Sequence, residues 1–279
     1  MRLSPVVLPL LLATSFTLSA ASASAAPTPL PPPEDSALAA LDRSPRHGEW
    51  VDVEYAGHGP IRTWIVYPER KDKAGVVLVI HEVFGLTDWI RSVADRLAAE
   101  GFIAVAPDLI SGLGPGGGGT DSTHSRDDAV KLVRLLTPEE SAARIGAMVT
   151  WARKLPAANG KLATIGFCWG GARSFMAAAM DPSPQGCVVY YGTSPDSVQI
   201  LGVKAPVLGH YGGDDARVNS TIDAAKAALK KQKVSYEPNI YPGAGHGFLR
   251  QQALRDGANL KASEQSWPKT IAFLRSRLK

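Results

Sequence analysis

Short apolar runs alternate with longer amphipathic stretches along most of this chain. Runs of about four to eight aliphatic or β-branched residues, as at 76–81 and 163–167, are typical of buried strands. Longer stretches with apolar positions three and four residues apart, as at 138–154, are typical of helices that pack one face on a sheet. Strands that alternate with helices in this way indicate an α/β fold with a mainly parallel central sheet and helices on both faces. The predicted strands are 51–55, 62–67, 76–81, 103–106, 163–167, 187–191, 207–211 and 237–241. The predicted helices are 89–100, 126–135, 138–154, 170–180, 220–232 and 264–278.

The N-terminal segment has a different pattern from the rest of the chain. A positive charge at Arg2 precedes an apolar run over 6–18, and small residues over 20–26 include the cleavage option Ala23-Ser24-Ala25. This pattern predicts a secretory signal peptide, since the run is too short for a membrane span. We therefore expect an exported bacterial protein, periplasmic or secreted, with no membrane anchor after cleavage. The predicted domains are a signal peptide at 1–25, a proline-rich linker at 26–47 and one α/β domain at 48–279.

Composition and charge limit which ligands and partners the chain is expected to bind. The chain has 279 residues, of which 45% are hydrophobic, enough for one domain with a sizeable core. The net charge of +4 is modest, and the lysines between 226 and 233 are typical of a solvated helix face. No pair of histidines has clear metal-ligand spacing, and the glycine-rich segment 112–119 lacks the Lys-Ser/Thr of a phosphate loop. We expect a small-molecule substrate, a monomer, and neither a metal, a cofactor nor a nucleic-acid partner.

The strongest chemical signal is Gly166-Phe167-Cys168-Trp169-Gly170-Gly171, between a predicted strand and a predicted helix. A nucleophile flanked by small residues at such a junction is the nucleophile elbow of an α/β-hydrolase, here with cysteine in place of serine. Glycines suit the flanks because larger side chains would clash with the neighbouring strand and helix. The N–H groups at the start of the following helix would favour a thiolate at Cys168 and later an oxyanion. The alternative is a glycine turn with a buried, structural cysteine.

An acidic residue and a histidine follow the elbow in the chain order of this fold. Asp214 and Asp215 come just after one predicted strand, and His246 comes just after another. Flanking glycines let each loop turn toward a cleft. A nucleophile, an acid and a histidine in register predict a catalytic triad, with either aspartate as the acid. The other histidines are weaker candidates, and His81 and His210 close apolar strands, where we expect them to be buried.

From about Gly48 to the C-terminus, the chain resembles the dienelactone hydrolase family (carboxymethylenebutenolidase-like proteins) of α/β-hydrolases. The more specific part of the resemblance is the cysteine elbow together with His81-Glu82-Val83-Phe84-Gly85. The resemblance implies hydrolysis of an ester or lactone by a Cys-His-Asp triad through a thioester. Further matching segments are Ala106-Pro107-Asp108-Leu109, Tyr190-Tyr191-Gly192, Gly212-Gly213-Asp214-Asp215 and Ala244-Gly245-His246-Gly247-Phe248.

The resemblance assigns roles within the triad. Cys168 would be the nucleophile and His246 the base that later protonates the leaving group. Asp215 would orient the histidine, because the family pattern Gly-Gly-x-Asp-x-x-Val aligns with Asp215 and Val218. In the family, the glutamate that matches Glu82 contacts the resting cysteine and helps to deprotonate it, which protects the thiol from oxidation until substrate arrives.

The resemblance also implies how the substrate is held. The backbone N–H groups of Trp169 and Val83 would form the oxyanion hole. Arg250, Phe84 and Phe248 would lie at substrate-binding positions.

A family clamp for the substrate carboxylate is only half present. Family members that act on the carboxylated lactone hold it with two arginines, one of which matches Arg250. The second position falls at Ile110-Ser111-Gly112, unless Arg126 or Arg91 folds in from elsewhere. We expect Arg250 to bias the pocket toward acidic or polar esters, with a structural ion pair as the alternative role.

Several alternatives remain at the level of sequence. Within enzymes, the alternatives are a general carboxylesterase, a thioesterase or an acyltransferase. Outside enzymes, they are a ligand-binding protein or a redox-sensing protein.

Two further expectations concern the second cysteine and the glycine-rich segment. Cys187 starts an apolar strand and should be buried, and we expect both Cys187 and Cys168 to be reduced. The segment 112–119 is either a mobile lid or rim near the site, or a disordered insertion.

Overall fold

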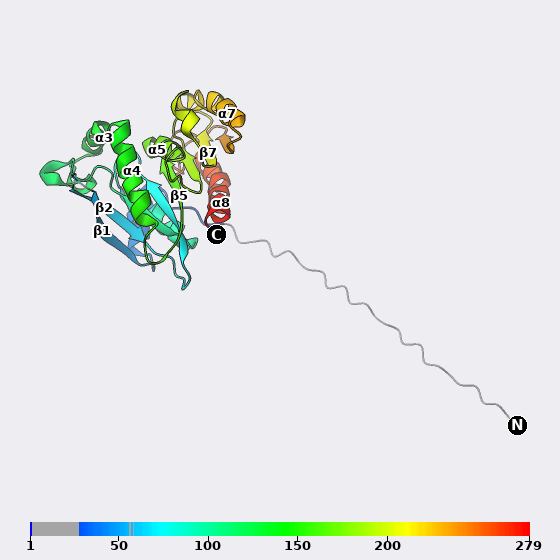
Figure 1. Ribbon diagram of the computed structural model, residues 1–279, viewed down its shortest axis with the longest axis horizontal. Helices are drawn as coiled ribbons and strands as arrows, with labels where there is room; N and C mark the ends of the chain where they lie inside the picture. The colour runs from blue at the N-terminus through cyan, green and yellow to red at the C-terminus, as the bar shows by residue number, and fades with distance from the viewer. Residues whose placement is uncertain (2–27, 56, 58) are drawn as a thin grey trace.

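The computed structural model describes Met1, residues 28–55, Gly57 and residues 59–279. Apart from Met1, the predicted signal peptide lies outside the described residues. The described chain forms an eight-stranded sheet in the order β1-β2-β4-β3-β5-β6-β7-β8, with helices on both faces (Figure 1). The predicted α/β fold is confirmed. The strands are β1 (Gly48–Tyr55), β2 (Gly59–Val66), β3 (Ala74–Ile80), β4 (Ile103–Pro107), β5 (Ala158–Phe167), β6 (Cys187–Tyr190), β7 (Val207–Gly212) and β8 (Tyr236–Tyr241).

The direction of the strands brings their carboxyl ends to one edge. β1 pairs antiparallel with β2, and β2 antiparallel with β4, whereas all other neighbours are parallel. β3 is buried at every residue because helices cover both its faces. In the register between β3 and β5, Val79 lies opposite Ile165. The loops after the parallel strands therefore meet at a common edge, which is where ligands bind in open α/β sheets.

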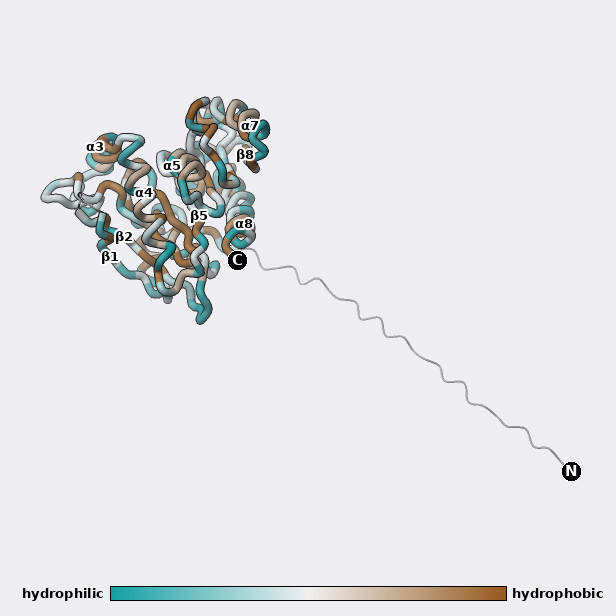
Figure 2. The backbone as a smooth tube through the Cα atoms, viewed as in Figure 1, coloured by the Kyte–Doolittle hydropathy of each residue, from teal (hydrophilic) through white to brown (hydrophobic). Residues whose placement is uncertain are grey.

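Two apolar cores cover the two faces of the sheet. Val77 and Val79 contribute to the core that α1, α2 and α8 complete, whereas Val76 and Leu78 contribute to the core beneath α3, α4, α5 and α7. The alternation follows from the two-residue period of a strand. Figure 2 shows hydrophobic colouring along β5 in the interior and hydrophilic colouring on the outer side of α7. The helices are α1 (Ala37–Asp42), α2 (Asp88–Ala99), α3 (Arg126–Leu135), α4 (Pro138–Ala152), α5 (Trp169–Ala177), α6 (Ala216–Asn219), α7 (Ile222–Lys231) and α8 (Ala258–Leu278). Short 3-10 turns are η1 (Glu34–Ser36), η2 (Pro115–Gly117), η3 (Thr120–Ser122) and η4 (Gln199–Gly202).

The N-terminal segment expected to be a linker folds onto the domain. Its described part includes η1 and α1, and Ala37 is fully buried against the α2 side of the sheet. Ser44 and Arg46 both hydrogen-bond to Asp95 on α2. The backbone carbonyls of Pro31 and Pro32 accept hydrogen bonds from the domain, as described below. Residues 28–46 are therefore called the N-terminal arm.

The glycine-rich segment 112–119 is held by one buried aspartate. Asp108, at the end of β4, accepts hydrogen bonds from the N–H and hydroxyl of Thr120 at 2.6 and 2.9 Å and from the N–H of Ile110 at 3.3 Å. The Thr120 hydroxyl in turn accepts from the N–H of Leu86 at 2.8 Å. These bonds fasten the loop to the turn after β3, so it is a folded part of the domain and not a disordered insertion.

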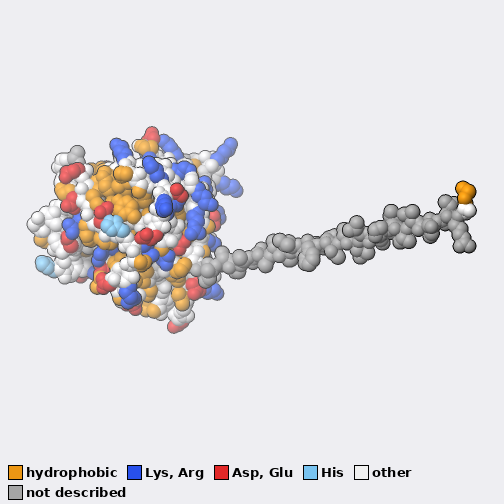
Figure 3. Space-filling model, turned by 90° about the horizontal axis from the view of Figure 1, so that it is seen from below, with side chains coloured by type: hydrophobic (Ala, Val, Ile, Leu, Met, Phe, Trp, Pro, Cys, Tyr) orange, Lys and Arg blue, Asp and Glu red, His pale blue; other side chains and the backbone are white. Residues whose placement is uncertain are grey.

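The described surface is mixed in character. On the face shown in Figure 3, Lys and Arg side chains are interspersed with acidic and hydrophobic ones. Within the described part of the chain, no helix has both the length and the apolar character needed to cross a membrane.

Candidate active site

Cys168 stands between β5 and α5 in a strained backbone conformation, with φ 55° and ψ −115°. A positive φ is unfavourable for a residue with a Cβ atom, and at a strand-to-helix turn it is the geometry of a nucleophile elbow. A Cβ atom on Gly166 would lie 1.9 Å from the carbonyl oxygen of Gly170. One on Gly170 would lie 2.3 Å from the carbonyl oxygen of His81. The close approaches explain why glycine is required at these two positions.

The Cys168 thiol is partly exposed and protonated at neutral pH. Burial raises its pKa to about 11, and the negative charge of Glu82 adds to the shift. The backbone N–H of Trp169 opposes the shift by a hydrogen bond to the sulfur. Burial thus outweighs the stabilisation of a thiolate that the start of α5 was expected to give. Because a cysteine is a nucleophile only as its thiolate, nucleophilic chemistry at Cys168 would need a base.

His246 is paired with Asp215, the second of the two candidate aspartates. His246 Nδ1 lies 2.5 Å from Asp215 Oδ2, and the Asp215 side chain is 8% exposed. The other carboxylate oxygen of Asp215 accepts from the N–H of Val218 and caps α6, which fixes the acid in place. Asp214 points elsewhere, because its carboxylate pairs with Arg255 at 2.8 Å. The geometry therefore favours Asp215 as the partner that orients the histidine.

The loop that carries His246 is tied to the start of α8. Asn259 is 1% exposed, and its side-chain oxygen accepts from the N–H of Gly245 at 3.0 Å. Its side-chain nitrogen donates to the carbonyl oxygen of Gln251 at 2.8 Å. The helix begins at Ala258, earlier than the predicted 264, so that Asn259 is part of its first turn. The sequence did not indicate that Asn259 would hold the loop of His246, because asparagine is common near the starts of helices, where it caps the helix.

Glu82 lies buried in the turn after β3, near the cysteine. Its side chain is 2% exposed, and Oε2 lies 2.9 Å from Nε of Arg250 as an ion pair. Burial raises its pKa to about 7, while the positive charge of Arg250 opposes the shift. A carboxyl group with a pKa near neutrality can take up and release a proton under physiological conditions.

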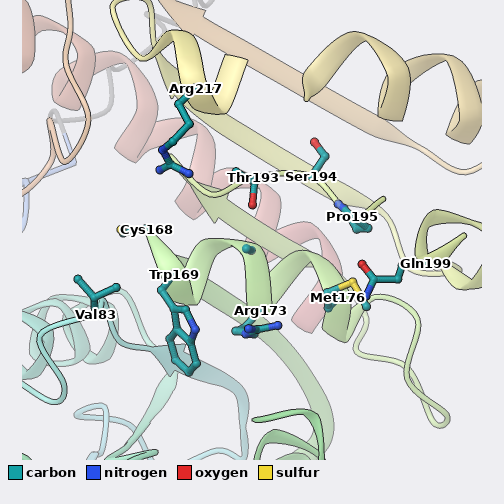
Figure 4. A pocket seen from close by; sticks show the side chains of 11 residues that line it. Val83, Cys168, Trp169, Arg173, Met176, Thr193, Ser194, Pro195, Gln199 and Arg217 are labelled. Carbon is teal, nitrogen blue, oxygen red and sulfur yellow. The ribbon is translucent and has the colours of Figure 1, made fainter. Parts of the chain in front are cut away.

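A cavity of about 340 Å³ opens beside Cys168 (Figure 4). Val83 and Trp169, whose N–H groups are the predicted oxyanion donors, both line it. Arg173 on α5 and Arg217 on α6 bring positive charge to the cavity from two sides (Figure 4). The complete lining is Val83, Cys168, Trp169, Ala172, Arg173, Met176, Thr193, Ser194, Pro195, Gln199 and Arg217.

The three residues expected to bind substrate lie outside this lining. Phe248 is fully buried and packs on Tyr190 and Tyr191, with ring centroids 5.9 and 5.5 Å apart, so it supports the site from behind. Phe84 lies beneath the guanidinium of Arg250, 5.3 Å from ring centroid to Cζ. Arg250 itself is occupied by carboxylates of the chain, namely Glu82 and Glu34.

His81 and His210 are fully buried, as predicted, and hold the backbone and core in place. The N–H of Leu109 donates to His81 Nε2 at 3.1 Å, so Nδ1 carries the proton and donates to the carbonyl oxygen of Glu82 at 2.7 Å. Burial lowers the pKa of His210 to about 3. Among the described residues, no three His, Cys, Asp or Glu side chains cluster so as to bind a metal ion.

Sequence reasoning missed several residues that surround the site. Glu34, Arg173 and Arg217 belong to no local motif, and their positions depend on how distant segments meet. The Tyr191 ring lies 5.1 Å from that of His246, and Tyr191 has a positive φ of 40°. The Tyr190-Tyr191-Gly192 match was the one signal for this segment, without a role attached to it.

Known proteins of one family match this chain over most of its length. The sequence model of the dienelactone hydrolase family matches residues 61–278. A protein of Salmonella typhimurium, provisionally named a carboxymethylenebutenolidase, is 28% identical over 86% of this chain and 88% of its own length. A protein of Methylorubrum extorquens with the same provisional name is 30% identical over 68% of each chain.

Solved structures agree with this assignment. A provisionally assigned dienelactone hydrolase from Klebsiella pneumoniae has a TM-score of 0.69 and 25% identity, covering 81% of this chain and 97% of its own. A dienelactone hydrolase-like promiscuous phosphotriesterase from metagenomic libraries has a TM-score of 0.71 at 22% identity, covering 84% of this chain and 99% of its own. The second comparison supports the fold alone.

Proposed function

The chain belongs to the dienelactone hydrolase family and is an ester hydrolase, and we propose that a Cys168-His246-Asp215 triad cleaves its carboxylic ester or lactone substrate. One observation carries this proposal. Asp215 contacts His246 at 2.5 Å, at the edge of the sheet where Cys168 stands strained in its elbow and lines a cavity. A nucleophile, a base and an orienting acid in these positions have the roles needed for acyl transfer.

The first half-reaction forms a thioester. The thiol proton passes to Nε2 of His246 as Sγ of Cys168 attacks the carbonyl carbon. His246 then gives that proton to the leaving oxygen as the C–O bond breaks. Asp215 keeps Nδ1 protonated and stabilises the imidazolium. The N–H groups of Trp169 and Val83 stabilise the developing oxyanion.

The second half-reaction releases the acid. His246 takes a proton from water, whose oxygen attacks the thioester carbonyl. The C–S bond breaks, the carboxylic acid leaves, and Sγ of Cys168 regains the proton. Glu82 assists the first deprotonation, because its buried carboxylate lies near a thiol whose pKa of about 11 keeps it unreactive at rest.

The test is whether an acyl group becomes attached to Cys168 and not to Cys187. Cys168→Ala should lose about 10⁴-fold or more in kcat on 4-nitrophenyl butyrate, as expected when a triad nucleophile is removed. Intact-protein mass spectrometry of the wild-type protein, quenched in acid during the first turnovers of this ester, should show one added butyryl group, absent in Cys168→Ala.

The matched control is Cys187→Ala, because Cys187 is the other free thiol of the described chain and is fully buried. It should keep both turnover and acylation. Turnover by Cys168→Ala at the wild-type rate would contradict the triad. A panel of lactones and linear esters then identifies the acyl group.

We also propose that the protein is exported after cleavage near Ala25. The supporting pattern is the charge, apolar run and small residues of the first 26 positions. The described N-terminal arm begins at Thr28 and packs on the domain, so cleavage before it would leave the folded part complete.

A further inference from the structure

Glu34 of the N-terminal arm has its carboxylate between two arginines of the domain. Arg250 Nη1 donates to Glu34 Oε2 at 2.5 Å, and Arg126 on α3 pairs with the other carboxylate oxygen. Each carboxylate oxygen thus has its own guanidinium partner. Charge-assisted bonds to both oxygens are how proteins recognise carboxylate ligands.

An aromatic ring forms the floor of this arrangement. The Cζ atoms of Arg126 and Arg250 lie 5.1 and 5.3 Å from the centroid of the Phe84 ring. Cation–π contacts of this kind orient guanidinium groups and reduce their freedom. Arg126 begins α3 and Arg250 lies between β8 and α8, and together with Phe84 they form a site already shaped for an anion.

Burial makes an anion necessary at Arg250. Its side chain is 8% exposed, and an unpaired charge in such a position is costly. Glu82 is its other partner, at 2.9 Å, and burial raises the pKa of that carboxyl to about 7. Glu82 alone is therefore protonated for part of the physiological pH range, and Glu34 supplies the second negative charge.

Backbone groups just before Glu34 and at Glu34 itself fasten the arm to the domain. The side chains of Gln252 and Trp89 donate to the carbonyl oxygens of Pro31 and Pro32, at 2.9 and 3.2 Å. The N–H of Glu34 donates to the carbonyl oxygen of Arg250 at 3.1 Å. Because backbone contacts hold the arm, replacing the Glu34 side chain should leave the arm in place and vacate only the carboxylate position.

The carboxylate position is connected to Cys168 through Glu82. Arg250 contacts Glu82, and the charges of both residues act on Cys168. An acyl chain attached at Cys168 that carried a carboxylate toward Arg250 would meet Glu34 instead of a vacant cation.

We propose that Arg250, Arg126 and Phe84 form a carboxylate-binding site that this chain fills with its own Glu34, so that Glu34 selects against substrates with an anionic acyl end. Removing the Glu34 carboxylate opens the site to a small external carboxylate. The catalytic part of this inference rests on the proposed ester hydrolysis. It also replaces the bias toward acidic esters that Arg250 alone would predict.

The first test compares two esters of similar shape. Mono(4-nitrophenyl) succinate ends in a carboxylate where 4-nitrophenyl butyrate ends in a methyl group. Glu34→Ala should raise the succinyl-to-butyryl ratio of kcat/KM by roughly ten- to a hundredfold, the effect of one charge-assisted hydrogen bond. Glu34→Gln should raise it less, because the amide still fills the site. Adding Arg126→Ala to Glu34→Ala should reverse the rise.

The control is Asp35→Asn, which changes the net charge equally at the next, exposed residue. It should leave the ratio unchanged. An equal rise in Asp35→Asn, or no rise in Glu34→Ala, would overturn the proposal, since the effect would then come from overall charge or not exist.

The second test needs no turnover. Calorimetric titration with succinate should detect saturable binding to Cys168→Ala/Glu34→Ala and none to Cys168→Ala. Equal affinities in the two proteins would overturn the binding site. Loss of hydrolysis on every ester, with the difference in succinate binding retained, would instead overturn the proposed enzymatic function and leave this site standing.

Discussion

The two free thiols of the described chain, Cys168 and Cys187, differ more in how accessible the sulfur is than in pKa. Burial raises the pKa of Cys168 to about 11 and that of Cys187 to about 12, so both are protonated at neutral pH. Cys168 lines the cavity, whereas Cys187 is fully buried at the start of β6. Reactivity at this site therefore depends on a neighbouring base and on an open path to the sulfur.

Adjacent aspartates give a direct test of the acid. Asp215→Asn should lower kcat by roughly 10²- to 10⁴-fold, because an amide no longer holds the productive tautomer of His246. Asp214→Asn removes only an exposed ion pair with Arg255 and should stay within a few-fold of wild type. Steady-state kinetics of the two variants, with circular dichroism to check folding, makes the comparison. The reverse ranking would assign the acid to Asp214.

The buried carboxyl of Glu82 should make stability depend on pH. Its pKa is raised from 4.5 to about 7, so the folded state holds a proton that the unfolded state has lost between these values. The stability from this group is therefore complete below about pH 4.5 and is lost as the pH rises to about 7. Relative to wild type, Glu82→Gln should gain roughly 1–3 kcal/mol in free energy of unfolding between about pH 5 and pH 8.

Denaturant unfolding of both proteins at the two pH values measures this difference. Glu264→Gln, at an exposed position on α8, is the control and should show no such gain. A pH-independent difference for Glu82→Gln would mean that Glu82 is ionised throughout, held so by Arg250.

At the level of elements, the start of α8 positions the histidine loop. Asn259→Ala would leave the N–H of Gly245 without its acceptor, a loss of roughly 1–3 kcal/mol for a buried group. We expect kcat to fall while KM changes little, because His246 moves and the cavity lining does not include this loop. Kinetics and thermal unfolding measure the two effects. Leu260→Ala, at the next and exposed residue, should change neither, and an equal loss there would contradict the role of Asn259.

Helices and strands were predictable where their pattern is local. Each of the eight strands and six longer helices was placed by apolar periodicity, with boundaries shifted by a few residues. α1 and α6 escaped prediction because each is short and depends on contacts made elsewhere. Ala37 is buried by the docking of the arm, and α6 is capped by Asp215.

At the scale of the whole molecule, the site residues divide in the same way. The elbow and His246 lie within motifs whose backbone geometry is local, and their positions could be predicted from spacing and chain order. Spacing left Asp214 and Asp215 both open as the acid, and the resemblance to the family favoured Asp215. The pairing of Arg250 with Glu34 could not be predicted, because Glu34 lies in a segment whose sequence is typical of a linker. The sequence also could not show that Phe248 is a core residue and not a substrate-binding one, since phenylalanine is common both in cores and in pockets.

The proposed cleavage of a signal peptide predicts which residue is the first of the mature protein. N-terminal sequencing of protein secreted from a bacterial host should begin near Ala26, because the small residues at Ala23 and Ala25 match signal-peptidase cleavage. The secreted protein should retain the whole described arm and full esterase activity. An intact Met1 on the exported form would contradict cleavage.

The pairing of Glu34 with Arg250 sets an order for folding during synthesis. The two residues are 216 positions apart in the chain. A chain emerging from its N-terminus presents Glu34 almost at once but exposes Arg250 only near the end. Contacts of such long range close late, after local helices and neighbouring strands have formed. Glu34 can therefore pair with Arg250 only after nearly the whole chain has emerged, and a chain that lacks the arm displays the arginine pair with no carboxylate between them.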